Sequence, residues 1–161
     1  MLREQLQSGQ NLSTPTPERL ATWRLFFESS WALLDVLDRE LQAECSMPLR
    51  WYDVLVHLEE APGTRLRMGE LGNQILSSKS GLTRVVDRLE EAGFVRRERA
   101  DGDRRVIEVV PTDAGMGALA AARPIHRRGI QEYFARHLDD PDVAALGSAL
   151  KKVHDEVRAA R

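Results

Sequence analysis

The chain has 161 residues, 42% of them hydrophobic and 30% charged, which is typical of one globular unit large enough to bury a sizeable core. No stretch approaches 18 apolar residues and there is one cysteine, so the sequence excludes a membrane span and an internal disulfide framework. The first residues lack the basic-then-apolar pattern of a secretion signal, and we therefore expect a cytoplasmic protein.

The chain begins with a polar segment and continues into a long helix. Residues 1–15 are rich in Ser, Gln, Thr and Pro, which predicts a flexible N-terminal arm. Thr16 followed by Pro17 is typical of a helix start, because threonine caps the first turn and proline fits the first helical position. We expect residues 16–46 to form a helix that takes part in dimerisation. A stripe stepping by three or four positions runs along it through Trp23, Phe27, Ser30, Leu34, Leu37 and Leu41.

Shorter helices are predicted next. Residues 49–60 form an amphipathic run that ends before the Pro62-Gly63 pair. The apolar spacing over residues 68–76 predicts a short helix, and a turn separates it from the helix that follows. Two helices joined in this way are typical of a helix-turn-helix, whose second helix enters the major groove of DNA.

The following helix has one apolar and one polar face. Ser77 or Ser78 can cap its start, and Gly93 can take the left-handed conformation that ends it. Its apolar positions repeat with helical spacing at Leu82, Val85, Val86 and Leu89. An ordinary surface helix has the same pattern. Here the opposite face suits contacts to bases and phosphates, since it carries Lys79, Ser80, Thr83, Arg84, Asp87 and Arg88.

Two strands with an arginine-rich turn follow the glycine. Residues 95–99 and 105–110 are rich in valine, isoleucine and alternating charge, and Asp101, Gly102 and Asp103 suit the turn between them. Because the net charge of the chain is −2, binding to a polyanion requires locally concentrated bases. They concentrate here, as Arg96, Arg97, Arg99, Arg104 and Arg105. A charged hairpin without a binding role is the alternative.

From about Leu49 to Gly115 the sequence resembles the winged-helix core of the multiple antibiotic resistance regulator (MarR) family of DNA-binding regulators. The matching motifs, in the family's order and spacing, are L-R-W-Y-D-V-L (49–55), S-G-L-T-R-V-V-D-R-L-E (80–90), A-G-F-V (92–95), D-R-R (103–105) and P-T-D-A-G (111–115). The resemblance implies that Arg105 enters the minor groove and that Asp103 steadies it. The family usually has L-T where this chain has Pro111-Thr112, a departure away from the hairpin tip.

The C-terminal part predicts two further helices. Thr112 suits an N-cap, and Pro124 predicts a kink or a break in the helix that it opens. Asp140 and Pro141 start the last helix, whose apolar seam runs through Val143, Leu146, Leu150, Val153 and Val157. Long apolar stripes have little to cover in so small a chain, so we assign residues 112–161 to homodimerisation. An intramolecular bundle is the alternative.

The predicted fold class is mainly α with a small β-hairpin wing. Residues 47–111 form a winged helix-turn-helix core, flanked by long N- and C-terminal helices that make a dimerisation domain. We expect a homodimer that binds double-stranded DNA at a pseudo-palindromic operator, and the resemblance implies a transcriptional repressor that responds to a ligand. The predicted DNA contacts are Ser78, Lys79, Ser80, Thr83, Arg84, Arg88, Asp103, Arg104 and Arg105.

The resemblance also implies a small aromatic or phenolic effector, held between the dimer helices and the winged helix. The residues that suit such a cleft are Trp23, Phe27, Trp31, Arg50, Trp51, Tyr52 and His57. The alternative is a regulator switched by oxidation at Cys45, although an inert thiol fits its place near the end of the first helix. The four histidines are scattered, so we expect neither a metal site nor a cofactor.

Two other classes of function fit the sequence less well than a DNA-binding regulator. An enzyme would be marked by a Gly-rich phosphate loop, a G-x-S-x-G elbow or an H-E-x-x-H helix, and the sequence has none of them. A winged helix used only for protein interaction, without specific DNA binding, would leave the arginines of the hairpin without a role. We therefore expect a DNA-binding regulator.

Overall fold

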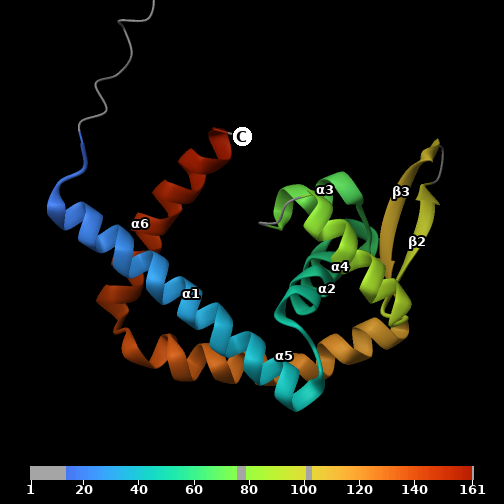
Figure 1. Cartoon of the computed structure of the whole chain (residues 1–161), viewed down its shortest axis with the longest axis horizontal. Helices are drawn as coiled ribbons and strands as arrows, with labels where there is room; N and C mark the ends of the chain where they lie inside the picture. Colours follow the sequence, from blue (N-terminus) through green and yellow to red (C-terminus); the bar gives the residue numbers. More distant parts are fainter. Residues whose placement is uncertain (1–13, 76–78, 101–102, 161) are drawn as a thin grey trace, which may run out of the picture. The chain divides into compact units, whose positions relative to one another are not determined.

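The computed structural model describes residues 14–75, 79–100 and 103–160, with the backbone alone at 79–80 and 103–105. Within these ranges the chain is mainly helical and carries one small antiparallel sheet (Figure 1). Contacts divide it into two compact units, one of residues up to Ala32 and one of residues from Leu33 onward. The predicted class, mainly α with a small β wing, is confirmed. The predicted arm falls largely on residues 1–13, outside the described ranges.

Helix α1 (Pro17–Cys45) begins where the sequence predicts it. The Thr16 hydroxyl accepts a hydrogen bond from the backbone N–H of Arg19 at 3.4 Å. In the unit that ends at Ala32, this helix exposes large apolar side chains, and the Trp23 ring lies 5.9 Å from that of Phe27. A group of exposed apolar side chains of this size is typical of an interaction surface. The exposed apolar side chains of this part of α1 are Leu20, Trp23, Leu25, Phe26, Phe27 and Trp31.

Three helices contribute side chains to the core of the second unit. They are α2 (Leu49–Glu60), α3 (Met68–Gln74) and α4 (Lys79–Glu91). The bounds of α2 are those that the sequence predicts. The predicted inward face of α4 is also confirmed, because Leu82, Val86 and Leu89 are buried and Val85 is partly buried. Burial of this face turns the polar face of α4 outward. The side chains without exposed surface include Leu55, Leu58, Leu71, Leu89 and Leu119.

The sheet contains the predicted hairpin and one strand more. Strands β2 (Val95–Ala100) and β3 (Asp103–Pro111) pair as predicted, and β1 (Leu66–Arg67) adds to β3 with Leu66 opposite Val109, in the order β1-β3-β2. A strand of two residues is too short to produce an alternating pattern, so β1 could not be predicted from the sequence. The predicted turn glycine, Gly102, lies outside the described residues.

The end of α4 joins the hairpin to the next helix. Gly93 takes the left-handed conformation with φ of 75°, and Phe94 donates its N–H to the Leu89 carbonyl at 2.9 Å, as in a glycine-ended helix. Thr112 caps α5 (Asp113–Tyr133) by accepting from the N–H of Gly115 at 3.1 Å, and its hydroxyl donates to the Gly93 carbonyl at 2.6 Å. The cap predicted at Ser77 or Ser78 lies outside the described residues.

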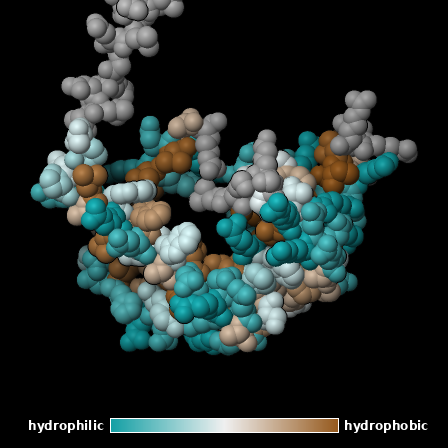
Figure 2. Space-filling model, in the orientation of Figure 1, coloured by the Kyte–Doolittle hydropathy of each residue, from teal (hydrophilic) through white to brown (hydrophobic). Residues whose placement is uncertain are grey.

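Helix α5 runs through Pro124 without a break, so of the predicted kink or break the break does not occur. Leu119, Ala122 and Gly129 are buried on both sides of the proline, and this packing holds the two halves in one helix. Helix α6 (Asp140–Ala159) begins as predicted, with Asp139 accepting from the N–H of Asp142 at 2.8 Å. Its predicted apolar seam lies largely on the surface, where Val143, Leu150, Val153 and Val157 are exposed. Figure 2 shows hydrophobic side chains among those that reach the surface of the molecule.

Short 3-10 turns complete the described elements, at Pro62–Thr64 and Ala135–His137. None of the helices in the described ranges has both the length and the apolar character needed to cross a bilayer.

Candidate nucleic-acid interface

Helix α4 presents its basic face to solvent. Thr83, Arg84 and Arg88 are exposed, while the leucines on the other side of the helix are anchored in the core. Lys79 and Ser80 belong to the first turn of α4, but their side chains are outside the described set, as is all of Ser78. The structure therefore brings Thr83, Arg84 and Arg88 onto one exposed helix surface, as a reader of DNA requires.

The hairpin stands beside α4, where Figure 1 shows β2 and β3 extending away from the helices. Asp103, Arg104 and Arg105 form the start of β3, which places their backbone close to the turn. Their side chains are outside the described set, so the predicted roles of Arg105 and Asp103 stay predictions.

Two arginines of the hairpin are engaged within the protein. Arg97 pairs with Asp87 and Glu90 of α4, and Arg96 pairs with Glu98 on its own strand at 2.5 Å. Burial acts to lower the pKa of Arg97, but its hydrogen bonds to the two carboxylates prevail and raise this pKa, so the guanidinium stays charged. The basic surface of the wing is thus smaller than the five arginines in the sequence suggest.

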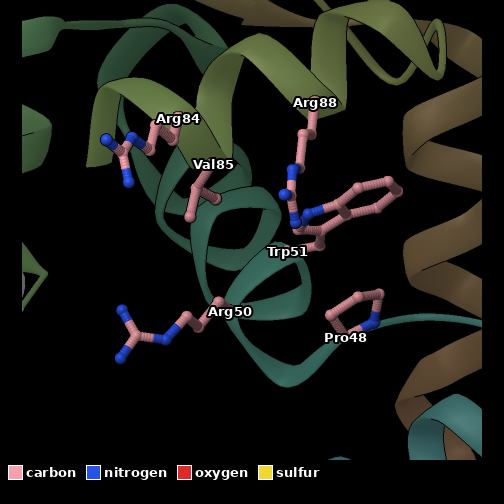
Figure 3. A pocket seen from close by; sticks show the side chains of 6 residues that line it. All are labelled: Pro48, Arg50, Trp51, Arg84, Val85 and Arg88. Carbon is pink, nitrogen blue, oxygen red and sulfur yellow. The ribbon is translucent and has the colours of Figure 1, made fainter. Parts of the chain in front are cut away.

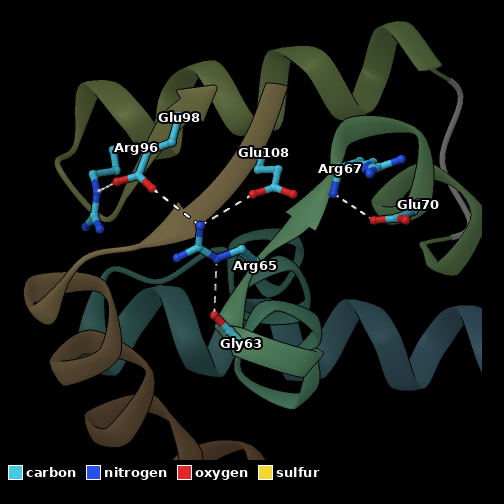
Figure 4. Close-up of polar contacts among 7 residues, drawn as sticks. All are labelled: Gly63, Arg65, Arg67, Glu70, Arg96, Glu98 and Glu108. Carbon is cyan, nitrogen blue, oxygen red and sulfur yellow. Dashed lines mark hydrogen bonds and ion pairs between the residues drawn. The ribbon is translucent and has the colours of Figure 1, made fainter. Parts of the chain in front are cut away.

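A second polar network lies on the sheet (Figure 4). Arg65, just before β1, places Nη1 3.5 Å from Glu108 Oε2 and 3.8 Å from Glu98 Oε2. Glu98 is also paired with Arg96, whose hydrogen bond is the main reason that the pKa of Glu98 is lowered. These contacts join β2 and β3 to the residue that precedes β1.

A pocket of about 240 Å³ opens between the start of α2 and the middle of α4 (Figure 3). Two predicted ligand residues, Arg50 and Trp51, line it together with two predicted DNA contacts, Arg84 and Arg88. In Figure 3 the Arg88 side chain extends from α4 toward the indole of Trp51. Pro48 and Val85 complete the lining. The pocket therefore offers apolar and aromatic surface beside three guanidinium groups, which suits a small aromatic anion.

The other two predicted ligand residues of α2, Tyr52 and His57, have partners away from this pocket. The buried Tyr52 ring lies 4.4 Å from the ring of His126, and His57 Nε2 lies 3.5 Å from Asp53 Oδ1. Burial raises the pKa of Asp53, and the nearby His57, His126 and Arg50 reduce this effect. Burial lowers the pKa of His126, and Asp53 opposes the shift. Tyr52 thus packs against α5 and His57 pairs within α2, and neither residue lines the pocket on α4.

The remaining predicted ligand residues, Trp23, Phe27 and Trp31, belong to the unit that ends at Ala32 and are exposed. Phe27 and Trp31 line a shallow hollow together with Glu28.

Cys45 lies half-buried at the end of α1, where its thiol donates to the Leu41 carbonyl at 3.1 Å. Among the residues that the structure describes, no three His, Cys, Asp or Glu side chains are grouped to hold a metal ion.

The sequence did not show the individual partners of Arg97, Arg65 or His126. Their roles depend on partners that are distant in sequence: 10 residues separate Arg97 from Asp87 and 43 separate Arg65 from Glu108. The excess of arginine in the hairpin was a signal for charge, but it did not show which arginines pair with the helix.

Comparison with known proteins gives the same architecture. A model of the MarR family matches residues 46–106. The regulator Sco3205 from Streptomyces coelicolor, solved in complex with DNA, is 34% identical, with 89% of this chain and 94% of that chain covered and a TM-score of 0.83. AbsC from the same organism is 31% identical, with 91% and 98% covered and a TM-score of 0.83.

The transcriptional repressor MprA of Escherichia coli (strain K12) is 29% identical over 110 residues, which are 68% of this chain and 61% of MprA. The match spans between 30% and 66% of the length of the curated relatives. The two Streptomyces structures, in contrast, exceed 30% identity over nearly their whole length. From these matches, together with the helix, hairpin and flanking helices described above, we conclude that the chain belongs to the MarR family of transcriptional regulators.

Proposed function

We propose that this protein is a sequence-specific DNA-binding regulator that acts mainly as a repressor. It binds a pseudo-palindromic operator as a homodimer. One observation carries the proposal: α4 buries its apolar face and exposes Thr83, Arg84 and Arg88 beside a basic hairpin. Helix α4, which we call the recognition helix, fits the major groove of DNA, and an arginine of the hairpin fits the minor groove. The related Sco3205, solved in complex with DNA, supports this assignment.

The flanking helices supply the dimer. Large apolar side chains are exposed on α1, and valines and a leucine are exposed on α6. A second copy of the chain would remove these surfaces from water, and a two-fold dimer places two recognition helices on two half-sites about one helical turn apart. We assign residues 16–46 and 112–161 to this role.

The pocket between α2 and α4 supports an effector site for a small aromatic anion. Its occupant would contact Arg84 and Arg88, which are also proposed DNA contacts, so effector and DNA compete for the same guanidinium groups. Arg50 and Trp51 would hold the effector from α2. This arrangement couples binding of the effector to release of the operator without requiring a large change of fold. Such a regulator acts in the cytoplasm and has no catalytic role.

The first test is binding of the purified protein to duplex DNA from its own upstream region across a salt series. We expect binding that weakens steeply with salt and that exceeds binding to random duplex. Replacement of Arg105 by Ala is expected to weaken operator binding by about 1 to 3 kcal/mol while the protein stays folded. Equal binding to every sequence would contradict the proposal and favour an interaction module.

The effector site is tested separately with a panel of benzoates and phenols. We expect a member of the panel to release the operator from the wild type. Arg50→Ala is the informative variant, because Arg50 lies on α2 and lines the pocket without lying on the recognition helix. It is expected to bind DNA and to lose the response. A response that is unchanged in Arg50→Ala would place the effector elsewhere.

A further inference from the structure

Arg97 connects the hairpin to the recognition helix through three hydrogen bonds. Its Nη2 lies 2.5 Å from Asp87 Oδ1, and its Nη1 donates to Glu90 Oε2. Its backbone N–H donates to the other oxygen of Glu90 at 2.9 Å. Asp87 and Glu90 are three residues apart, so they lie one above the other on the same side of α4. The Arg97 side chain is 26% exposed, whereas that of Arg96 is 52% exposed.

The contact involves the backbone of the strand as well as its side chain. In the order β1-β3-β2, strand β2 lies at the edge of the sheet, and Arg97 is opposite Val109 of β3. An edge strand has backbone groups that no neighbouring strand satisfies. Glu90 accepts one of these, so α4 holds β2 directly. A side-chain pair alone would leave the strand free to move within the reach of two flexible side chains.

The opposite face of β2 is held as well. Neighbouring residues in a strand point to opposite faces, so Glu98 points away from the side on which Arg97 meets α4. Glu98 faces Arg65, which also reaches Glu108 of β3 at 3.5 Å (Figure 4). Strand β2 is therefore held by α4 on one face and by Arg65, just before β1, on the other.

We propose that Arg97 is a positioning residue that fixes the wing relative to the recognition helix, and that it does not contact phosphate. This inference rests on the function proposed above. Asp87 and Glu90 are acidic groups on a helix that reads a polyanion, where unpaired carboxylates would repel phosphates. Arg97 compensates part of their charge and uses them as fixed points for the hairpin. The recognition helix and the wing then lose little conformational entropy when they bind the major and minor grooves.

Substitution of Asp87 distinguishes a positioning role from a purely electrostatic one, because the two explanations predict changes of opposite sign in the affinity for DNA. Removal of a carboxylate near DNA strengthens binding if charge alone matters. Removal of a carboxylate that holds the wing weakens binding. Asp87→Ala leaves the two hydrogen bonds from Arg97 to Glu90 intact, so the fold and the strand keep one anchor.

The experiment measures the affinity of the full chain for an operator fragment across a salt series. The proteins compared are the wild type, Asp87→Ala, Arg97→Ala, the double variant that combines these two substitutions, and Glu91→Ala. Glu91 is the matched control, because it is an exposed acid on α4 to which the described residues supply no hydrogen bond or ion pair. Urea unfolding and oligomeric state are measured for each variant. The wild type must show salt-dependent, sequence-specific binding; its failure would refute the proposed function instead of the role of Arg97.

We expect Asp87→Ala and Arg97→Ala to weaken operator binding by about tenfold each, with the double variant little worse than either single one. Their affinities should fall with salt as steeply as that of the wild type, because no phosphate contact is lost. Glu91→Ala should bind at least as tightly as the wild type. The proposal is overturned if Asp87→Ala binds as tightly as Glu91→Ala. It is also overturned if Arg97→Ala reduces the salt slope by about one, the signature of a lost phosphate contact.

Discussion

Gly115 is the position at which a single methyl group should disturb the joint between the recognition helix, the wing and α5. A Cβ added there would lie 2.0 Å from the Phe94 carbonyl oxygen and 2.9 Å from its carbon. Ordinary carbon–oxygen contacts are longer by more than about 1 Å. The obstacle is backbone, so no side chain can turn aside. The same carbonyl accepts the N–H of Thr112 at 3.0 Å, so displacement of Phe94 also weakens this bond.

The expected cost follows from these contacts. Overpacking against a fixed neighbour costs about 1 to 3 kcal/mol, and loss of the Thr112 bond adds about 1 kcal/mol. Alanine regains about 0.5 to 1 kcal/mol over glycine within a helix. Gly115→Ala should therefore lower the free energy of unfolding by about 1 to 3 kcal/mol. Urea unfolding at one fixed protein concentration measures this difference, because the stability of a dimer depends on concentration.

Gly117 provides a matched control two residues further along the same helix. An added Cβ there meets no atom within 4 Å, and the residue is exposed. Gly117→Ala should raise the free energy of unfolding by about 0.5 to 1 kcal/mol, since only the helix preference changes. The two substitutions thus differ in sign. If Gly115→Ala stabilised the protein as Gly117→Ala does, the close approach of α5 to Phe94 would be refuted.

Two further predictions concern the core and the pH dependence of stability. Leu89 has no exposed surface, so Leu89→Ala should lower the free energy of unfolding, measured with urea, by about 2 to 5 kcal/mol. Its neighbour Arg88 is exposed, and Arg88→Ala should change the free energy of unfolding by less than about 0.5 kcal/mol. Equal effects would mean that the faces of α4 are assigned wrongly. Burial lowers the pKa of His126 from its ordinary value of 6.5, partly opposed by Asp53, so the folded protein binds this proton less tightly than the unfolded chain. The resulting stability is present above about pH 6.5 and is lost as pH falls through the lowered pKa. The urea midpoint should therefore fall between about pH 7.5 and 5.5, and should fall less in His126→Phe; identical pH profiles would exclude this histidine as a source.

Local sequence was sufficient to predict several of the helix ends. Thr16-Pro17, Gly93 and Thr112 act through backbone groups within a few residues, so capping rules locate them without knowledge of the fold. The inward face of α4 was likewise predictable, because its leucines and valines repeat with the period of the helix. Pro124 shows the opposite case, since local preference allowed a break there, whereas the helix continues with buried residues on both sides of the proline.

The site divides in the same way. The amino-acid pattern was enough to predict that a helix with Thr83, Arg84 and Arg88 on its polar face precedes a basic hairpin, and these motifs carried the resemblance to the family. The distribution of the charges became visible in the folded chain. Asp87 and Glu90 engage Arg97, and Arg84 and Arg88 share a pocket with Arg50. The reason is physical: periodicity and capping depend on neighbours along the chain, whereas an ion pair or a pocket depends on which distant elements the core brings together.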